Sequence, residues 1–192
     1  MKGVRWVVAI LCVALMTGCA TGRKSTSEEP PSKAKSYYQQ GVSLSEEGNY
    51  PAALSALKKA VNAHPGYGDA YYNMGIVYQN LDRPEEAIEA YQKAAEINPN
   101  DAAARNNLGN AYLREDRLSE AILELEAAVK IDPAYALAHH NLALAYYLSR
   151  MYHRAWDQLR ELKLLGVSPE PSLFQAVADA LGLEEGDRIQ KQ

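Results

Sequence analysis

Residues 68–101 read GDAYYNMGIVYQNLDRPEEAIEAYQKAAEINPND, and this stretch decides the fold. Its first half spaces large and small apolar residues at i, i+3, i+4 and i+7, which is one face of a helix: Tyr71, Met74, Gly75 and Tyr78. Pro84 suits the first position of a second helix, and Glu85 and Glu86 suit the positive end of that helix dipole. The stretch therefore predicts two helices joined by a short turn.

The same features return every 34 residues along the chain. Prolines stand in one column at Pro65, Pro99 and Pro133. Two columns of small residues read Gly41, Gly75, Gly109, Ala143 and Ala53, Ala87, Ala121, Ala155. Two columns of larger apolar residues read Leu44, Tyr78, Tyr112, Tyr146 and Leu57, Tyr91, Leu125, Leu159. Small residues let paired helices approach closely, and large residues fill the space between neighbours, so the columns predict stacked helix pairs.

These columns resemble the small, large and proline positions of the tetratricopeptide repeat family, which has this period. Four windows carry the resemblance: 34–67, 68–101, 102–135 and 136–169. The fourth departs late, because Leu162 replaces a small residue and Val167 replaces the proline. The resemblance implies an all-α fold, an alpha-solenoid of about four tetratricopeptide helix pairs.

A solenoid needs its ends covered, since each pair buries its apolar face only against the next pair. After a break at residues 167–171, one face of a short helix would carry Leu173, Phe174, Val177 and Leu181. We therefore expect residues 170–192 to form a C-terminal capping helix, over 172–182, and a polar tail from Glu184. Trp156 stands at an apolar position of the last repeat and is expected to pack in the core.

The N-terminus has the features of an export signal. Residues 1–5 carry two positive charges, and the apolar run over 6–16 is shorter than the roughly 20 residues that span a bilayer. Residues 15–19, LMTGC, resemble a bacterial lipobox. The resemblance implies that 1–18 is a lipoprotein signal peptide and that the thiol of Cys19 carries a diacylglycerol. The alternative is an ordinary signal peptide with a chance cysteine.

Residues 19–33 would then form the lipidated Cys and a flexible tether, because they contain no large apolar residue. By resemblance to the lipoprotein sorting rule, Ala20 after the cysteine favours the outer membrane. The expected location is therefore the periplasmic face of the bacterial outer membrane. A secreted protein or an inner-membrane lipoprotein is the alternative.

In tetratricopeptide proteins the first helix of each pair lines a concave groove. By this resemblance three columns line it: Tyr38, Tyr72, Asn106, His140; Val42, Ile76, Asn110, Leu144; and Ser45, Gln79, Leu113, Tyr147. A fourth column holds Gln39, Asn73, Asn107 and Asn141. In some superhelical arrays, asparagines of this column hydrogen-bond the backbone of an extended peptide, since an amide carries both donor and acceptor. The alternative is that asparagine merely suits this partly polar helix position.

Composition and motifs exclude several classes of function. A formal net charge of −4 is unsuited to neutralising phosphates, so we expect no nucleic-acid partner. The C-x-x-C, H-E-x-x-H and G-x-S-x-G patterns do not occur, so we predict no enzyme, no metal site and no cofactor. The four histidines are expected to face solvent or the groove: His64, His139, His140 and His153.

The sequence thus predicts a lipid-anchored scaffold whose groove binds a protein partner, as an extended segment or a helix, and holds an assembly at the membrane. In layout the chain looks like the pilotins of type IV pilus secretins. A second scaffold interpretation is an adaptor for cell-wall synthases or hydrolases. The rival classes are an enzyme subunit, for which no catalytic group is apparent, and a small-ligand binding protein, which would need an enclosed pocket.

Overall fold

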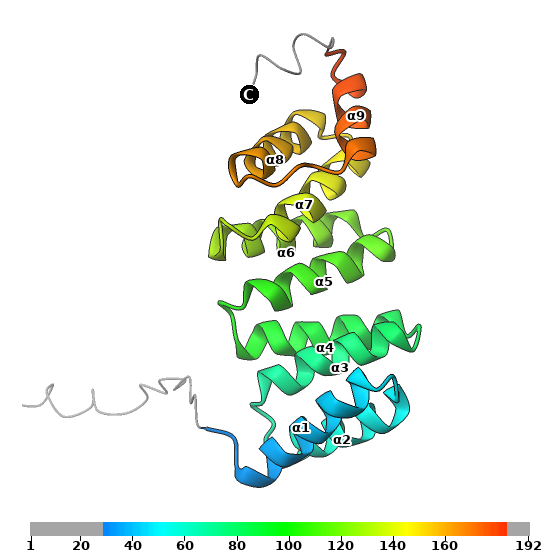
Figure 1. Ribbon diagram of the computed structural model, residues 1–192, viewed down its shortest axis with the longest axis vertical. Coiled ribbons are helices and arrows are strands. Elements are labelled where there is room, and N and C mark those ends of the chain that lie inside the picture. Colours follow the sequence, from blue (N-terminus) through cyan, green and yellow to red (C-terminus); the bar gives the residue numbers. More distant parts are fainter. Residues whose placement is uncertain (1–28, 184–192) are drawn as a thin grey trace, which may run out of the picture.

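A row of α-helices joined by short turns makes up the computed structural model, which describes residues 29–183 (Figure 1). The helices are α1 (Ser32–Glu46), α2 (Tyr50–Ala63), α3 (Gly68–Asn80), α4 (Pro84–Ile97), α5 (Ala102–Arg114), α6 (Leu118–Ile131), α7 (Ala136–Leu148), α8 (Tyr152–Leu164) and α9 (Pro171–Ala180). Within residues 29–183 there is no strand. The predicted all-α class is confirmed.

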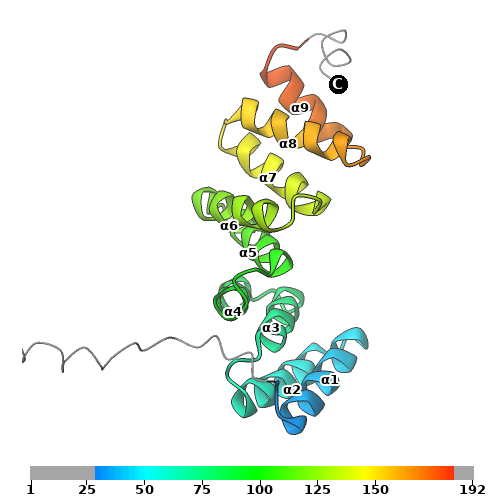
Figure 2. The same ribbon diagram turned by 90° about the vertical axis from the view of Figure 1, so that its left-hand side faces the viewer.

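The helices stack as antiparallel pairs along one long axis (Figures 1 and 2). The first helix of each pair packs on the second, as α1 on α2, α3 on α4, α5 on α6 and α7 on α8. Each second helix then packs on the first helix of the next pair, and α8 packs on α9. The predicted alpha-solenoid of four helix pairs with a terminal helix is therefore confirmed.

Within each pair, a small residue of the first helix faces a large residue of the second. A Cβ atom added to Gly41, Gly75 or Gly109 would lie 2.6, 2.5 or 2.5 Å from the nearest side-chain atom of its partner. These partners are fully buried, and in helix order they are Leu57, Tyr91 and Leu125. Real Cβ atoms do not approach so closely, so the small column is required by the distance between the paired helices.

Between pairs, a tyrosine column seals the stack. Tyr78, Tyr112 and Tyr146 are buried on the first helices of the second, third and fourth pairs. Gln92 Nε2 of α4 donates to the Tyr112 hydroxyl at 2.7 Å, and the Tyr146 hydroxyl donates to Glu126 of α6. Burial, with the bond to Glu126, raises the pKa of Tyr146 to about 12, so this hydroxyl stays protonated at neutral pH.

Each first helix ends in a left-handed residue, a feature the sequence prediction did not include. These residues are 34 positions apart: Gly48, Asp82, Asp116 and Arg150, with φ of 76°, 55°, 54° and 59°. The next backbone N–H in each case reaches back to the carbonyl of the helix's last turn, for example Met151 N to Tyr146 O at 2.8 Å. This 6→1 bond satisfies carbonyls that the helix end would otherwise leave unpaired.

The last helix, α9, covers the apolar face of α8. Val177 and Ala178 are fully buried, and the Phe174 ring lies 4.9 Å from the Trp156 ring. Trp156 is buried, as expected for core packing. The Glu170 carboxylate accepts from the backbone N–H groups of Ser172 and Leu173 and so caps the N-terminus of α9.

Both chain ends lie outside the described residues. The proposed signal peptide 1–18, the proposed lipidation site Cys19 and most of the tether 19–33 fall there, as does most of the tail from Glu184. In the part that the structure describes, no helix has both the length and the apolar character needed to cross a membrane.

We expect Gly48→Ala to lower the free energy of unfolding by about 1 kcal/mol, because an L side chain is strained at φ 76°. Nothing lies within 4 Å of the added Cβ, so strain alone would act. Gly66→Ala is the matched control, since its φ is not in the left-handed region and its Cβ would lie 3.5 Å from His64. Urea unfolding measures both, and equal midpoints for the two variants would contradict the role of Gly48.

Removing residues 170–192 should soften the fourth pair or cause aggregation. Burial of each large apolar side chain of α9 is worth roughly 1.5–3 kcal/mol before entropy is subtracted. Removing only 184–192 leaves α9 in place and is the control. Thermal unfolding and light scattering compare the two truncations, and a monodisperse 1–169 chain with an unchanged midpoint would show that α9 is no cap.

Candidate functional site

The first helices of successive pairs are joined to one another by side-chain hydrogen bonds. Asn73 Nδ2 of α3 donates to the Tyr38 hydroxyl of α1 at 3.4 Å, and Asn107 Nδ2 of α5 donates to the Tyr72 hydroxyl of α3 at 3.1 Å. One step further on, α7 is joined to α5 in the same way. The four first helices therefore lie side by side and share one surface.

We call this surface the first-helix face. It consists of the half-buried side chains at the predicted groove columns of α1, α3, α5 and α7. Its members are Tyr38, Val42, Tyr72, Asn73, Ile76, Asn107, Asn110, His140, Leu144 and Tyr147. Half-burial means that each packs at its base and keeps part of its surface for a partner.

Two predicted groove residues are not on this face. Asn106 and Asn141 are 1% and 5% exposed, and Asn141 Nδ2 donates to Asn106 Oδ1 at 2.9 Å. A buried amide must find its partners inside the protein, and these two find each other across α5 and α7. The prediction that they present their amides to a ligand is therefore wrong; they join two repeats instead.

The remaining asparagines differ in what they leave free. Asn107 donates to Tyr72 and accepts from Asn106 Nδ2 at 3.2 Å, so both ends of its amide are used. Asn73 uses its amide nitrogen twice, on Tyr38 and on the Asp69 carbonyl oxygen at 2.9 Å. Within residues 29–183 its side-chain oxygen has no hydrogen-bond donor, so Asn73 keeps an acceptor for a ligand.

Tyrosines gather at the α1–α3 end of the face. The Tyr38 ring lies 4.9 Å from that of Tyr67, which ends the α2–α3 connection. Burial, and then the nearby Asp69 carboxylate, raises the pKa of Tyr38; burial is also the main cause that raises the pKa of Tyr72. Both phenols stay neutral at neutral pH, and each accepts a bond from asparagine while its own hydrogen remains to donate.

Tyr67 and Tyr135 were missed by the sequence prediction. They occupy one column, 68 residues or two repeats apart, directly before α3 and α7. Tyr135 lies near enough to Tyr72 to raise its pKa. The signal that could have found them is their shared register with the groove columns, since a residue just before a first helix lies beside that helix's first turn.

Histidines behave differently in neighbouring positions of α7. His140 is half-buried on the first-helix face. His139 is only 6% exposed, with Nδ1 2.8 Å from Gln158 Oε1 and Nε2 3.0 Å from the Pro133 carbonyl oxygen. The expectation that all four histidines face solvent or the groove is wrong for His139. Arg105, one repeat earlier, binds the matching pair of groups, the Pro99 carbonyl and Glu124, so this position ties a first helix to its surroundings.

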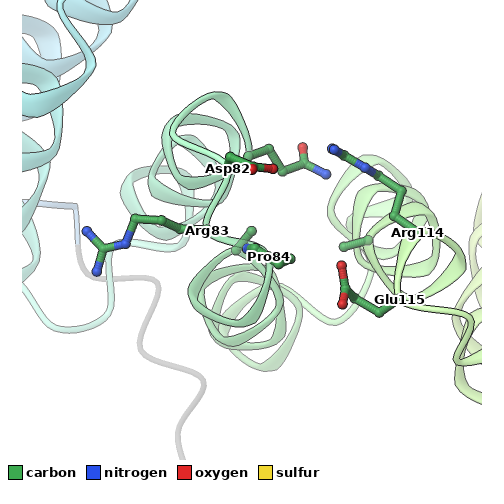
Figure 3. Close-up of a pocket in the computed structure, with 8 residues that line it drawn as sticks. Asp82, Arg83, Pro84, Arg114 and Glu115 are labelled. Carbon is green, nitrogen blue, oxygen red and sulfur yellow. The ribbon is translucent and has the colours of Figure 1, made fainter.

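A small cavity lies between the second and third pairs, where the α3–α4 turn meets the end of α5. Figure 3 shows Arg114 and Glu115 on its α5 side and Asp82 and Pro84 on its α3–α4 side, with Arg83 pointing away. Its volume is about 30 Å³, room for about one or two water molecules. Among the described residues, no group of three or more His, Cys, Asp or Glu could hold a metal ion.

Solved structures with the same fold include three informative cases. MamA superposes with a TM-score of 0.71 at 23% identity over 81% of this chain and 86% of its own. PilF of Pseudomonas aeruginosa is 27% identical, with a TM-score of 0.65 over 78% of this chain and 68% of its own. YrrB, described as a TPR protein with an unusual peptide-binding site, is 28% identical, with a TM-score of 0.63 over 78% and 75%. No curated protein matches the chain by sequence.

Family models for single and tandem repeats match much of the described chain. Tetratricopeptide repeat models match residues 35–67, 68–101 and 90–123, and a TPR repeat model matches 110–149. The first two matches follow the helix pairs α1–α2 and α3–α4, and the others continue into the fourth pair. Together with the stacked pairs and their 34-residue columns, these matches show that the chain belongs to the tetratricopeptide repeat family.

Proposed function

We propose that this protein is a scaffold that binds a segment of another protein along its first-helix face. The observation that carries the proposal is the unbroken row of half-buried tyrosine and aliphatic side chains on four adjacent first helices. Tyrosine offers large contact area, few rotatable bonds and a polar tip, which suits protein recognition. The likeness to YrrB, described as having a peptide-binding site, supports the same class of function.

The polar groups of the face fit a polypeptide backbone. The hydroxyls of Tyr38 and Tyr72 can donate, and the side-chain oxygen of Asn73 can accept. These are the two complementary groups that a peptide unit needs. Val42, Ile76 and Leu144 supply apolar surface between them, as a segment with alternating side chains would require.

A lipid anchor would hold this scaffold at the bacterial outer membrane, on its periplasmic face. The support is the lipobox-like sequence ending at Cys19 and the polar stretch that follows it. A flexible tether of about fourteen residues has a typical reach on the order of 20 Å, which would place α1 close to the bilayer surface. The first-helix face would then be presented to proteins that assemble at that membrane.

The assembly we favour is an envelope machine such as a type IV pilus secretin, because lipobox, tether and a short array are arranged as in pilotins. An adaptor for cell-wall synthases or hydrolases is the second candidate, since the same layout would serve it. Neighbouring genes separate the two: secretin and pilus genes would favour the first, and wall enzymes the second.

The double substitution Tyr38→Ala with Tyr72→Ala should weaken partner binding by about 2–4 kcal/mol if these rings are hot spots. It should cost less stability than Tyr78→Ala, because both rings are half-buried whereas Tyr78 is buried between pairs. Circular dichroism reports folding, and crosslinked partner yield in cells reports binding. A double variant that folds normally and captures every partner would remove the first-helix face as the working surface.

Cys19→Ser should abolish lipidation, because the sulfur is the acyl acceptor. The variant should be released in soluble form or accumulate as precursor. Metabolic labelling with a fatty acid makes the comparison, with Cys12→Ser as the control cysteine. Equal label in the wild-type protein and in the Cys19 variant would reject the anchor while leaving the binding face untouched.

A further inference from the structure

A second cavity, much larger than the one in Figure 3, lies at the C-terminal end of the stack. It opens between the start of α8 and the end of α9 and has a volume of about 460 Å³. Arg150, Tyr152, His153 and Arg154 line one side, and Ala180 and Leu181 line the other. Its size is sufficient for a large side chain and the backbone next to it.

The cavity exists because one side chain of the repeat pattern is missing. Ala180 stands 34 residues after Tyr146, in the column that holds Tyr78, Tyr112 and Tyr146 on earlier first helices. Those rings are 5–6% exposed, and the later two bond to the preceding second helix. α9 packs on α8 as a further first helix would, but an alanine methyl cannot fill the space of a phenol. The stack thus ends with an unfilled aromatic position.

The rim of this cavity reverses the charge found at the same place in other repeats. Arg150 replaces Asp82 and Asp116 of the second and third pairs, and Arg154 replaces Glu86 and Glu120. No acidic residue occurs between 148 and 156, although the whole chain has a net charge of −4. Of the two arginines, only Arg154 faces a described carboxylate within 4 Å, that of Glu126 at 3.6 Å, and its side chain stays 63% exposed.

The cavity is continuous with the first-helix face. Tyr147 belongs to that face, and its ring lies 5.9 Å from the ring of Tyr152, which lines the cavity. A polypeptide segment running along the face toward α7 would therefore reach the cavity mouth. Its side chains would meet an apolar recess with cations at the rim.

We propose that this cavity is a second docking site, which takes an aromatic side chain flanked by carboxylates on a partner protein. The ring would occupy the position left by Ala180, and the carboxylates would pair with Arg150 and Arg154. The site goes beyond the proposed function because it makes no use of Tyr38 or Tyr72. Loss of either site can therefore be measured without loss of the other.

The test uses a synthetic peptide, acetyl-Glu-Glu-Tyr-Glu-Glu-amide, titrated into the ¹⁵N-labelled protein. We expect saturable shifts of the backbone amides of residues 150–154 and 180–181. Two control peptides separate the components: one with Ala for Tyr removes the ring, and one with Lys for each Glu reverses the charge. Each control should bind about tenfold more weakly or not at all. Equal binding of all three peptides, or no saturable shift with the first, would overturn the proposal.

Two variants test the same site from the protein side. Ala180→Tyr should fill the cavity as Tyr146 does one repeat earlier, raise the melting temperature and abolish peptide binding. Arg154→Glu installs the residue that repeats two and three carry, so the fold should persist while affinity falls about tenfold. Arg114→Glu makes the same change of charge beside the smaller cavity and should leave affinity unchanged. Unchanged affinity in both cavity variants would reject the site.

The chain's own acidic residues 184–187 (EEGD) are the competing occupant. Deleting 184–192 distinguishes the two, because a partner site should keep its amide positions without peptide and bind the peptide equally well. If deletion alone shifted the amides of 150–154 and strengthened peptide binding, the tail would be the occupant and the partner site would be rejected.

Discussion

Every level of this structure depends on how closely the two helices of a pair approach. A missing side chain at Gly75 lets the Tyr91 ring lie where a Cβ would otherwise be, and the same contact recurs at Gly41 with Leu57 and at Gly109 with Leu125. This contact fixes the crossing of the pair, and the crossing fixes which faces remain for the next pair. Since the contact recurs every 34 residues, the rotation between pairs is repeated and the first helices stay on one side.

Polar side chains keep that side in register. Bonds from Asn73 to Tyr38, from Asn107 to Tyr72 and from Asn141 to Asn106 each span 35 residues and join successive first helices. A buried amide without a partner is costly, so these bonds favour one stacking arrangement over a slipped one. The same bonds decide what the face can offer a ligand, because an amide that holds two repeats together has less capacity left to read a peptide.

The sequence was sufficient for those parts of the fold that depend on spacing and residue size. The pairing of Gly75 with Tyr91, the burial of Trp156 and the apolar face of α9 all follow from columns that can be read without coordinates. Burial of Asn106 and Asn141 could not be read this way, since helix spacing does not tell whether a polar position near the groove edge faces solvent or the next repeat. The left-handed residue was also hidden, because Gly48, Asp82 and Arg150 share a backbone conformation and not a side-chain type. The cavity at Ala180 appears only once α9 is known to pack as a further first helix.

The central claim is that a protein partner binds across the first helices and not across the second ones. A photo-crosslinking amino acid placed at single positions in living cells tests it most directly. Ile76 is half-buried on the first-helix face, whereas Leu123 is 65% exposed on the second helix α6. We predict partner adducts from position 76 and none from position 123. Adducts from position 123 with none from position 76 would contradict the claim and move the working surface to the opposite side of the stack.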